Sequence, residues 1–337
     1  MHFQEHYNLK ELNTFGLAEE ARFFINLEEE SQLPELLKSE VYQNNPVLWL
    51  GGGSNLLLTR DFPGLVVKLN FKGKSVDIIN DKEAIASAKA GENWHQFVQF
   101  CLKQNLGGLE NLSLIPGNVG TAPIQNIGAY GVEIKDHFYR LRAFDLQEGI
   151  WCDFGPGDCD FGYRWSIFKG EHKGRYVISE VQFKLSRKDH FLRTSYGAIQ
   201  AELERLGLQP TIQNIAEAVI NIREAKLPNP AEIGNSGSFF KNPVVSEAEY
   251  DRLKMEFPDL VAYPAEQGYK LAAGWLIEKA GWKGFRRGDA GVHNKQALVL
   301  VNYGEAKGSE IKALSEEIQE SIYSTFAVSL EAEVNII

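Results

Sequence analysis

The chain has 337 residues, of which 44% are hydrophobic and 24% are charged, and its formal net charge is −10. This balance is typical of a globular protein with two or three domains and enough length to bury a sizeable core. The negative charge and the lack of basic runs argue against nucleic acid or an anionic membrane as a partner. An anionic ligand would therefore need a local site made by a few Lys and Arg side chains.

Targeting and metal motifs are also missing from the sequence. It contains no apolar run of about 18 residues, which a membrane-spanning helix would need, and no signal-peptide pattern at its start. The cysteines, Cys101, Cys152 and Cys159, have no CxxC or zinc spacing and predict reduced thiols in the cytoplasm. The histidines form no HExxH motif, so no metal site is expected, and His293 is expected to act through hydrogen bonds.

The beginning of the chain predicts short strands joined by a glycine-rich turn. Strand patterns occur at residues 21–26, 47–50, 56–58 and 64–70, and a helical stretch surrounds Leu33. The turn GGGSN at 51–55 directly follows the apolar VLWL. A buried strand that ends in glycines allows a phosphate to approach the backbone closely. No helical segment follows, so the turn is not the GxGxxG dinucleotide fingerprint.

Residues 107–131 combine many glycines with apolar side chains, an unusual mixture for a loop. The apolar anchors are Leu109, Leu112, Leu114, Ile115, Ile124 and Ile127. The neutral polar side chains are Ser113, Asn118, Thr121, Gln125, Asn126 and Tyr130. A flexible linker would lack such anchors, so we predict an ordered loop wrapped around a flat, polar ligand. The alternative is a glycine-rich surface loop without chemistry.

Amphipathic helices and further strands are predicted along the rest of the chain. A helix that ends at Gly107 has Trp94, Phe97, Val98, Cys101 and Leu102 on one face. Strands are expected at 139–146, 175–185, 297–302 and in the terminal EVNII, which pairing should bury. Helices are expected at 196–206, from about 211 to Pro228, from the capping box of Ser246 and Glu249 to Pro258, at 271–280, and along the stripe of Ile311, Leu314, Ile318 and Ile322.

Two side chains stand out as candidates for chemistry. Arg164 follows Tyr163 and precedes Trp165, so aromatic neighbours could hold its planar fork toward a carboxylate or phosphate. A surface Arg packed on an aromatic ring explains the same spacing. Ser238 follows Gly237 in a third glycine-rich stretch, 234–243, although a lone serine is more often only a turn hydroxyl. No GxSxG motif occurs, so hydrolase chemistry is not supported.

Charged residues of the C-terminal half offer two further candidates. Glu331 and Glu333 open the apolar terminal strand, where one could be a buried carboxylate, although a solvated strand edge is the simpler interpretation. We expect a diphosphate at a group of basic residues. They are Lys226, Lys241, Lys270, Lys279, Lys283, Arg286 and Arg287.

These motifs resemble, in order and along essentially the whole chain, the UDP-N-acetylenolpyruvoylglucosamine reductases, flavoenzymes of bacterial peptidoglycan (cell wall) precursor synthesis. The matching segments are NTFG (13–16), GGGSN (51–55), IPGNVGTAPIQNIGAYGVE (115–133), YRWSIFK (163–169), KLPNP (226–230), GNSGSFFKNPVV (234–245), AAGWLIEKAGWKG (272–284), HNKQALVLVN (293–302) and EAEVNII (331–337). YRWSIFK and Tyr196 resemble the longer subtype, in which a tyrosine closes over the substrate.

The resemblance implies an α+β fold. A two-part flavin domain of the vanillyl-alcohol-oxidase-like (PCMH) type would hold FAD, and a C-terminal α+β domain would bind substrate. The expected boundaries are 1–71 with the terminal strand 331–337 for the first FAD-binding part, 72–227 for the second, and 228–330 for the substrate domain. No Cys or His occurs in 50–60, so that turn would hold FAD noncovalently. We expect a cytoplasmic monomer.

The resemblance also implies residue roles. FAD would be bound by Gly51, Gly52, Gly53, Ser54, Asn55, Thr121, Gln125, Asn126, Gly128 and Tyr130. The nucleotide-sugar substrate would be bound by Tyr163, Tyr196, Lys226, Asn242, Tyr263, Lys270 and Gln296. The catalytic positions are Arg164, Ser238 and Glu333.

The implied reaction moves hydride from NADPH to FAD and then to C3 of UDP-N-acetylglucosamine enolpyruvate, which gives UDP-N-acetylmuramate. Arg164 would stabilise the negative charge that develops, Glu333 would hydrogen-bond the substrate carboxylate, and Ser238 would give a proton to C2. Two other classes remain open. One is an FAD-dependent alcohol or sugar oxidase with the same cofactor-binding fold, and the other is a nucleotide-sugar-binding protein without catalysis.

Overall fold

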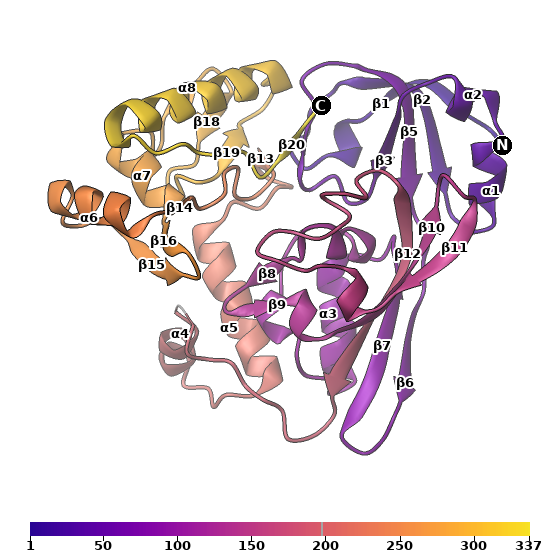
Figure 1. Cartoon of the computed structure of the whole chain (residues 1–337), viewed down its shortest axis with the longest axis horizontal. Coiled ribbons are helices and arrows are strands. Elements are labelled where there is room, and N and C mark those ends of the chain that lie inside the picture. The colour runs from indigo at the N-terminus through magenta and orange to yellow at the C-terminus, as the bar shows by residue number, and fades with distance from the viewer. Residues whose placement is uncertain (197) are drawn as a thin grey trace. The chain divides into compact units, whose positions relative to one another are not determined.

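The computed structural model describes residues 1–196 and 198–337, which form two compact units (Figure 1). The first unit consists of Met1–Tyr7, Ala21–Gly52 and Pro63–Ala225. The second consists of Asn8–Glu20, Gly53–Phe62 and Lys226–Ile337. The chain thus passes from one unit to the other within the GGGSN turn. The domain boundaries expected from the sequence stay a prediction.

The first sheet of the first unit confirms the early strand patterns. Its strand order is β1-β2-β5-β3. The strands are β1 (Gln4–Asn8), β2 (Glu20–Leu27), β3 (Val47–Leu50) and β5 (Phe62–Leu69). Two helices, α1 (Gln32–Leu37) and α2 (Glu40–Gln43), follow β2. Strands β3 and β5 are parallel, with Leu50 opposite Lys68. Leu33 and Leu36 of α1 are buried in one apolar cluster with Leu65 of β5. The apolar runs therefore form a sheet covered by a helix, as their pattern predicts.

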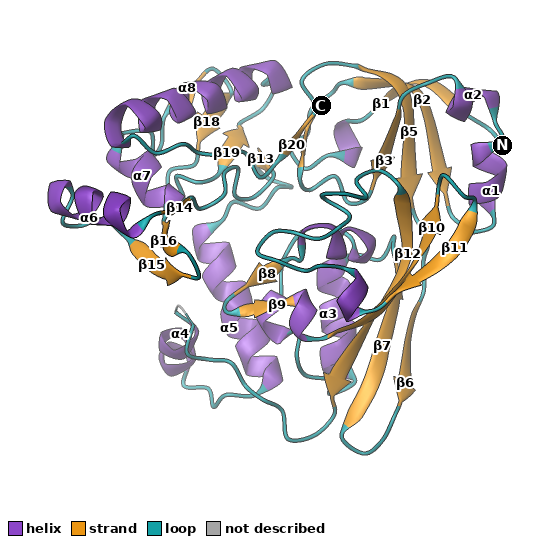
Figure 2. Cartoon of the chain, viewed as in Figure 1, coloured by secondary structure: helices purple, strands orange, loops and turns teal. Residues whose placement is uncertain are grey.

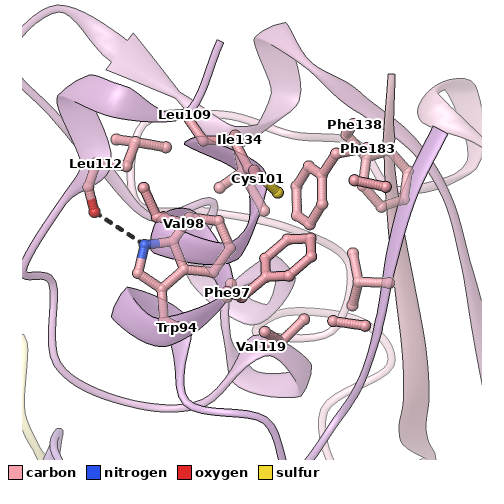
Figure 3. Close-up of a cluster of buried hydrophobic side chains, with 14 of the residues drawn as sticks. Trp94, Phe97, Val98, Cys101, Leu109, Leu112, Val119, Ile134, Phe138 and Phe183 are labelled. Carbon is pink, nitrogen blue, oxygen red and sulfur yellow. Dashed lines mark hydrogen bonds between the residues drawn. The ribbon is translucent and has the colours of Figure 1, made fainter. Parts of the chain in front are cut away.

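A longer antiparallel sheet forms the rest of the framework of this unit, in the order β11-β10-β12-β7-β6. Its strands are β6 (Lys74–Ile78), β7 (Glu83–Lys89), β10 (Phe138–Asp145), β11 (Ile150–Phe154) and β12 (Tyr176–Ser186). Helix α3 (Trp94–Lys103) buries its predicted face, where Trp94 and Phe97 meet Phe183 of β12 (Figure 3). The helix ends at Lys103, before the expected Gly107, because Asn105 has a φ of 55° and Leu106 N–H donates to Cys101 O at 3.0 Å.

Two further helices complete the first unit. Helix α4 (Ile199–Leu206) begins after the expected residue 196 and ends at Gly207, whose φ of 68° is left-handed. Gly197 lies outside the described residues. Helix α5 (Ile212–Lys226) ends before Pro228, as expected from the restricted backbone ahead of a proline. Ile215 and Val219 of α5 are buried in one cluster with Leu203 of α4.

The second unit contains short strands joined by loops, together with three helices in its described residues (Figure 2). Its sheets have the orders β13-β19-β18-β17, β14-β16-β15 and β20-β4. The strands are β4 (Leu56–Leu57), β13 (Gly234–Asn235), β14 (Val244–Val245), β15 (Ala262–Ala265), β16 (Gly268–Leu271), β17 (Arg286–Arg287), β18 (Ala290–Val292), β19 (Leu300–Asn302) and β20 (Asn335–Ile336). The helices are α6 (Glu247–Glu256), α7 (Ala273–Lys279) and α8 (Gly308–Phe326).

Several expectations for this unit are confirmed and two need correction. The capping box of Ser246 and Glu249 opens α6, and the apolar stripe of α8 is buried. The strand expected at 297–302 is shorter and covers only β19. Strand β20 pairs with β4 as expected, but only Val334 of EVNII is buried, whereas Asn335 and Ile336 are exposed, so the expected burial holds only in part. No helix in the part of the chain that the structure describes has the length and apolar character needed to cross a bilayer.

Candidate active site

Apolar side chains order the loop 107–131, as its composition predicts. Leu109 and Leu112 are buried in the core cluster that contains Trp94. The Trp94 indole N–H donates to Leu112 O at 2.9 Å, which fixes the loop to helix α3 (Figure 3). Short 3-10 turns follow at Glu110–Leu112, Val119–Thr121 and Pro123–Gln125, before the β8 (Gly128–Ala129) and β9 (Val132–Glu133) pair. Ile124 is 37% exposed, so the expectation that it anchors the loop is wrong.

Asn126 holds the far end of this loop. It is fully buried and has a φ of 44°, a left-handed conformation that asparagine tolerates better than most residues. Its amide nitrogen donates to Glu133 Oε2 and Gly162 O, both at 2.9 Å, and its Oδ1 accepts from Lys135 N–H at 3.2 Å. The side chain is therefore used within the protein, and a direct contact with a ligand would have to come from the Asn126 backbone.

The glycines of the 51–55 turn are needed for close packing of two chain segments. A Cβ added to Gly52 would lie 2.7 Å from Gly117 Cα, and one added to Gly51 would lie 2.4 Å from Thr121 Cγ2. Thr121 is itself oriented by donating to Asn118 O at 2.8 Å. Gly51 and Gly52 thus meet the 117–121 segment in a backbone cradle, which we call the glycine cradle.

Positive charge gathers beside Tyr130 at the end of the loop. Arg223 of α5 donates through Nε to Leu114 O at 3.2 Å and hydrogen-bonds the Tyr130 side chain. Burial lowers the pKa of Arg223, and the charge of Arg164 lowers it further. Arg223 could not be predicted from the sequence, because a helical pattern assigns only the apolar positions. Two guanidinium groups near a phenol provide a site for an electron-rich or anionic ligand.

Arg164 lies at the same end of the loop. Its φ is 53°, its Nη1 donates to Gly128 O at 3.2 Å, and its guanidinium carbon lies 5.6 Å from the centre of the Tyr163 ring. Tyr163 is 45% exposed and Tyr196 is 54% exposed. A Cβ added to Gly131 would lie 3.2 Å from Tyr196 Cβ. Within the first unit, the structure therefore brings Arg164 together with the predicted cofactor loop.

The second unit brings Ser238 and Glu333 onto neighbouring segments. Phe239 N–H donates to Leu298 O at 2.8 Å, and Phe239 O accepts from Glu333 N–H at 2.8 Å. Ser238 is exposed and Glu333 is half-buried. The Asn55 amide donates to Glu333 O at 3.2 Å. Asn55 was predicted to bind the cofactor, and its side chain also holds the segment that carries Glu333.

Two predicted substrate residues lie at the start of α7 in the same unit. Asn242 Oδ1 accepts from Ala273 N–H at 3.0 Å, and so satisfies an amide at the beginning of the helix. A Cβ added to Gly274 would lie 3.1 Å from Gln296 Oε1. Asn242 and Gln296 are thus neighbours of one helix terminus.

The remaining predicted substrate residues are more peripheral. Tyr263 and Lys270 are register partners in the hairpin of β15 and β16. Tyr263 is 52% exposed, and Lys226 is exposed at the end of α5. No described contact connects these three side chains with Ser238.

Most side chains of the basic group in the C-terminal half lie beside acids, and the expectation that a diphosphate binds there stays a prediction. The ion pairs are Lys241–Glu331, Lys279–Asp259, Lys283–Glu278, Arg286–Asp289 and Arg287–Glu317. The Glu331 side chain is 72% exposed, so it is not the buried carboxylate. His293 Nδ1 is buried without a hydrogen-bond partner among the described residues, and the expected hydrogen-bonding role of His293 stays a prediction.

The NTFG motif has a structural role that the sequence did not show. Thr14 N–H donates to Gly53 O at 3.1 Å, and Thr14 O accepts from Asn235 N–H at 2.9 Å. Phe15 O accepts from the Asn302 amide at 3.0 Å. NTFG therefore links the end of the first glycine-rich turn to the start of the 234–243 stretch.

Comparison with known proteins agrees with this arrangement. Residues 21–155 match the family model of an FAD binding domain, and 229–337 match the UDP-N-acetylenolpyruvoylglucosamine reductase C-terminal domain. The chain is 47% identical to the UDP-N-acetylenolpyruvoylglucosamine reductase of Flavobacterium johnsoniae, with all of both chains covered. It is 50% identical to that of Chromobacterium violaceum, over 99% of this chain and 98% of the relative. The solved reductase of Thermus caldophilus shares the fold, with a TM-score of 0.69, 24% identity, and 99% and 98% of the chains covered.

These matches define an α+β protein of the FAD-dependent oxidoreductase class, with an FAD-binding domain followed by a reductase-specific C-terminal domain. The chain belongs to the UDP-N-acetylenolpyruvoylglucosamine reductase family, whose members are UDP-N-acetylmuramate dehydrogenases of peptidoglycan precursor synthesis.

Proposed function

We propose that this chain reduces the enolpyruvyl ether of UDP-N-acetylglucosamine enolpyruvate to UDP-N-acetylmuramate, with NADPH as reductant. The observation that carries the proposal is the identity of 47% and 50% to two reductases over essentially the full length of each chain. The proposal includes a cytoplasmic monomer of the longer subtype, with Tyr196 closing over the substrate. In support, Tyr196 is exposed next to Gly131 at the end of the loop.

FAD fits the residues of the predicted cofactor site. The fit rests on the glycine cradle at Gly51 and Gly52 and on the guanidinium of Arg223, both of which suit an extended ligand with anionic and electron-rich groups. We assign noncovalent FAD binding to Gly51, Gly52, Gly53, Ser54, Asn55, Thr121, Gln125, Asn126, Gly128 and Tyr130. When bound, FAD supplies hydride transfer from NADPH to C3 of the enolpyruvyl group.

Residues of the chain itself stabilise the negative charge that forms on the substrate and supply the proton. Hydride addition at C3 leaves negative charge on C2 and on the adjoining carboxylate. We assign Arg164 to stabilise that charge as a fixed cation and Glu333 to hydrogen-bond the carboxylate. Ser238 then donates its hydroxyl proton to C2, which a weak acid can do only for a strong base held in contact. We assign substrate binding to Tyr163, Tyr196, Lys226, Asn242, Tyr263, Lys270 and Gln296.

The exchange Ser238→Ala tests these roles, with Ser236→Ala as a matched control. Ser236 lies two residues away, and its buried hydroxyl has no hydrogen-bond partner among the described residues, so its removal leaves no group unsatisfied. In stopped-flow measurements of flavin absorbance, S238A should keep its reduction by NADPH. Reoxidation by the enolpyruvyl substrate should slow by roughly 10²- to 10⁴-fold.

The outcomes separate the proposal from its alternatives. If S238A loses the NADPH step and keeps the substrate step, the role of Ser238 is wrong. If the wild-type chain binds FAD but consumes oxygen with sugar alcohols and does not turn over NADPH, it is an oxidase. If it binds the nucleotide sugar without flavin, it is a binding protein.

A further inference from the structure

Two lysines point at the backbone of the glycine cradle. Lys68 lies near the end of β5, and its ammonium group donates to Gly51 O at the start of the glycine turn. Lys72 follows shortly after, and its ammonium group donates to Gly91 O. Gly91 belongs to the cradle as well, because Gly91 O also accepts from the Asn118 amide at 3.4 Å. Both positive charges are therefore placed where the 51–52, 90–92 and 117–121 segments meet.

The charges at this place do not cancel. Glu92 is the nearby acid, and it accepts from Lys74 Nζ at 2.7 Å and from Gly73 N–H at 2.8 Å. Burial opposes the charged form of Glu92, but these hydrogen bonds lower its pKa overall. Among the ion pairs of the described residues, none includes Lys68 or Lys72. The cradle thus carries the charges of Lys68, Lys72 and Lys74 against one carboxylate.

The excess of positive charge affects the pKa of Lys68. Burial and the charge of Lys72 lower the pKa of Lys68 to about 8. A half-buried ammonium group with another cation nearby is destabilised, and an anion beside it would relieve that cost. A carbonyl such as Gly51 O provides only a partial negative charge. A diphosphate diester carries one negative charge on each phosphate, which matches the excess of the cradle.

We propose that Lys68, together with Lys72, binds the diphosphate of FAD at the glycine cradle. The inference rests on the proposed function, because it takes FAD as the ligand of the first unit. It adds two side chains to a site whose sequence motif contains only neutral residues. Lysine acts at a phosphate as a point charge, so the contact needs proximity and no particular fork geometry.

Equilibrium dialysis of the purified chain against FAD, and separately against riboflavin, tests the inference. Lys68→Met keeps the length of the side chain and removes its charge. We expect a 10- to 100-fold loss of affinity for FAD, the size expected for a hydrogen bond to a charged group. Affinity for riboflavin, which has no phosphate, should stay within about twofold. Lys68→Arg should retain most of the affinity for FAD.

A control lysine and a second variant keep the test decisive. Lys184 of β12 is paired with Glu83, and Lys184→Met should leave affinity for FAD unchanged. If K68M does not fold, Lys72→Met replaces it, since Lys72 is exposed, and the same selective loss is expected. The inference is overturned if these variants bind FAD as the wild type does, or if only the KM for NADPH or the nucleotide sugar rises. A wild-type chain that binds neither flavin overturns the proposed function itself.

Discussion

Basic side chains occur in two regions of this molecule, and their surroundings differ. At the glycine cradle of the first unit, the described ion pairs include neither Lys68 nor Lys72. In the C-terminal basic group of the second unit, five side chains each contact an acid, as in the pair of Arg287 with Glu317 at 2.7 Å. Basic residues are close together in the sequence in both regions, as Lys68, Lys72 and Lys74 in the first and as the residues from Lys279 to Arg287 in the second. Pairing with acids therefore separates the two regions where the density of positive charge along the sequence does not.

Lys89 and Lys68 of the first unit show the same difference between a lysine with carboxylate partners and one without. Burial alone would lower the pKa of Lys89, but hydrogen bonds with Glu180 and Glu30 raise it above its ordinary value. Lys68 is also partly buried, and without a carboxylate its pKa is lowered. The sign of the pKa shift thus follows whether a carboxylate lies beside the partly buried ammonium group.

The largest effect on stability is expected from Lys89→Met. Lys89 lies 2.6 Å from Glu30 and 2.8 Å from Glu180, and it is partly shielded from water. Its removal leaves Glu30 with Arg142 at 3.5 Å, and Glu180 with the hydrogen bond from Gln182 Nε2 at 2.8 Å and the charge of Arg140. We expect a loss of about 1–3 kcal/mol, below the value for a fully buried pair because solvent screens these groups.

Urea unfolding of K89M and K68M, both with the flavin removed, tests whether the two substitutions differ in their effect on stability. K68M should be as stable as the wild type or more stable, because it loses an unfavourable charge. In equilibrium dialysis, K89M should keep its affinity for FAD. A stable K89M together with a destabilised K68M would contradict the assignment of the two lysines.

Local patterns in the sequence predicted most of the framework. The apolar face of α3 from Trp94, the cap of α6 at Ser246 and the left-handed end of α4 at Gly207 follow from spacing and backbone preference, which need no knowledge of distant contacts. The ordered loop at 107–131 was predicted from the mixture of its residues. The family resemblance supplied the ligand and the residue roles, which composition and spacing left open.

The missed features depend on residues that lie far apart in the chain. Arg287 pairs with Glu317 thirty residues later, and Lys68 reaches Gly51 across the parallel pair of β3 and β5. Thr14 joins Gly53, which no local pattern indicates. Whether a charge is paired depends on such contacts, so the sequence alone did not separate the paired basic residues from the others.

A change of intermediate size is expected in the affinity for FAD when the pH is raised. The pKa of Lys68 without ligand is about 8, and an anion favours its charged form, so affinity for FAD should fall as the pH rises above 8. Lys72 is the other charged group that acts on Lys68. The decrease should reach at most tenfold per pH unit and should be absent in K68M.

The stability of the flavin-free chain should change with pH in the opposite direction to the affinity for FAD. In the unfolded chain Lys68 titrates near 10.5, so between about 8 and 10.5 the unfolded state binds more protons. The contribution of Lys68 to the stability of the flavin-free chain therefore rises with pH in that window. The difference in urea unfolding between the wild type and K68M, measured at pH 7 and 9.5, checks this sign. Parallel pH profiles of the two proteins would refute the shifted pKa.

The smallest effect is expected from Arg287→Met in the second unit. Nη1 and Nη2 of Arg287 both donate to Glu317 at 2.7 Å, but the side chains are 58% and 41% exposed. Exposed pairs contribute little to stability because water and salt screen them. The melting temperature should fall by no more than about 2 °C, and the KM for the nucleotide sugar should stay within about twofold. A tenfold rise in that KM, with an unchanged affinity for FAD, would show that the C-terminal basic group binds a diphosphate despite its acid partners, and pairing would then no longer distinguish the two regions.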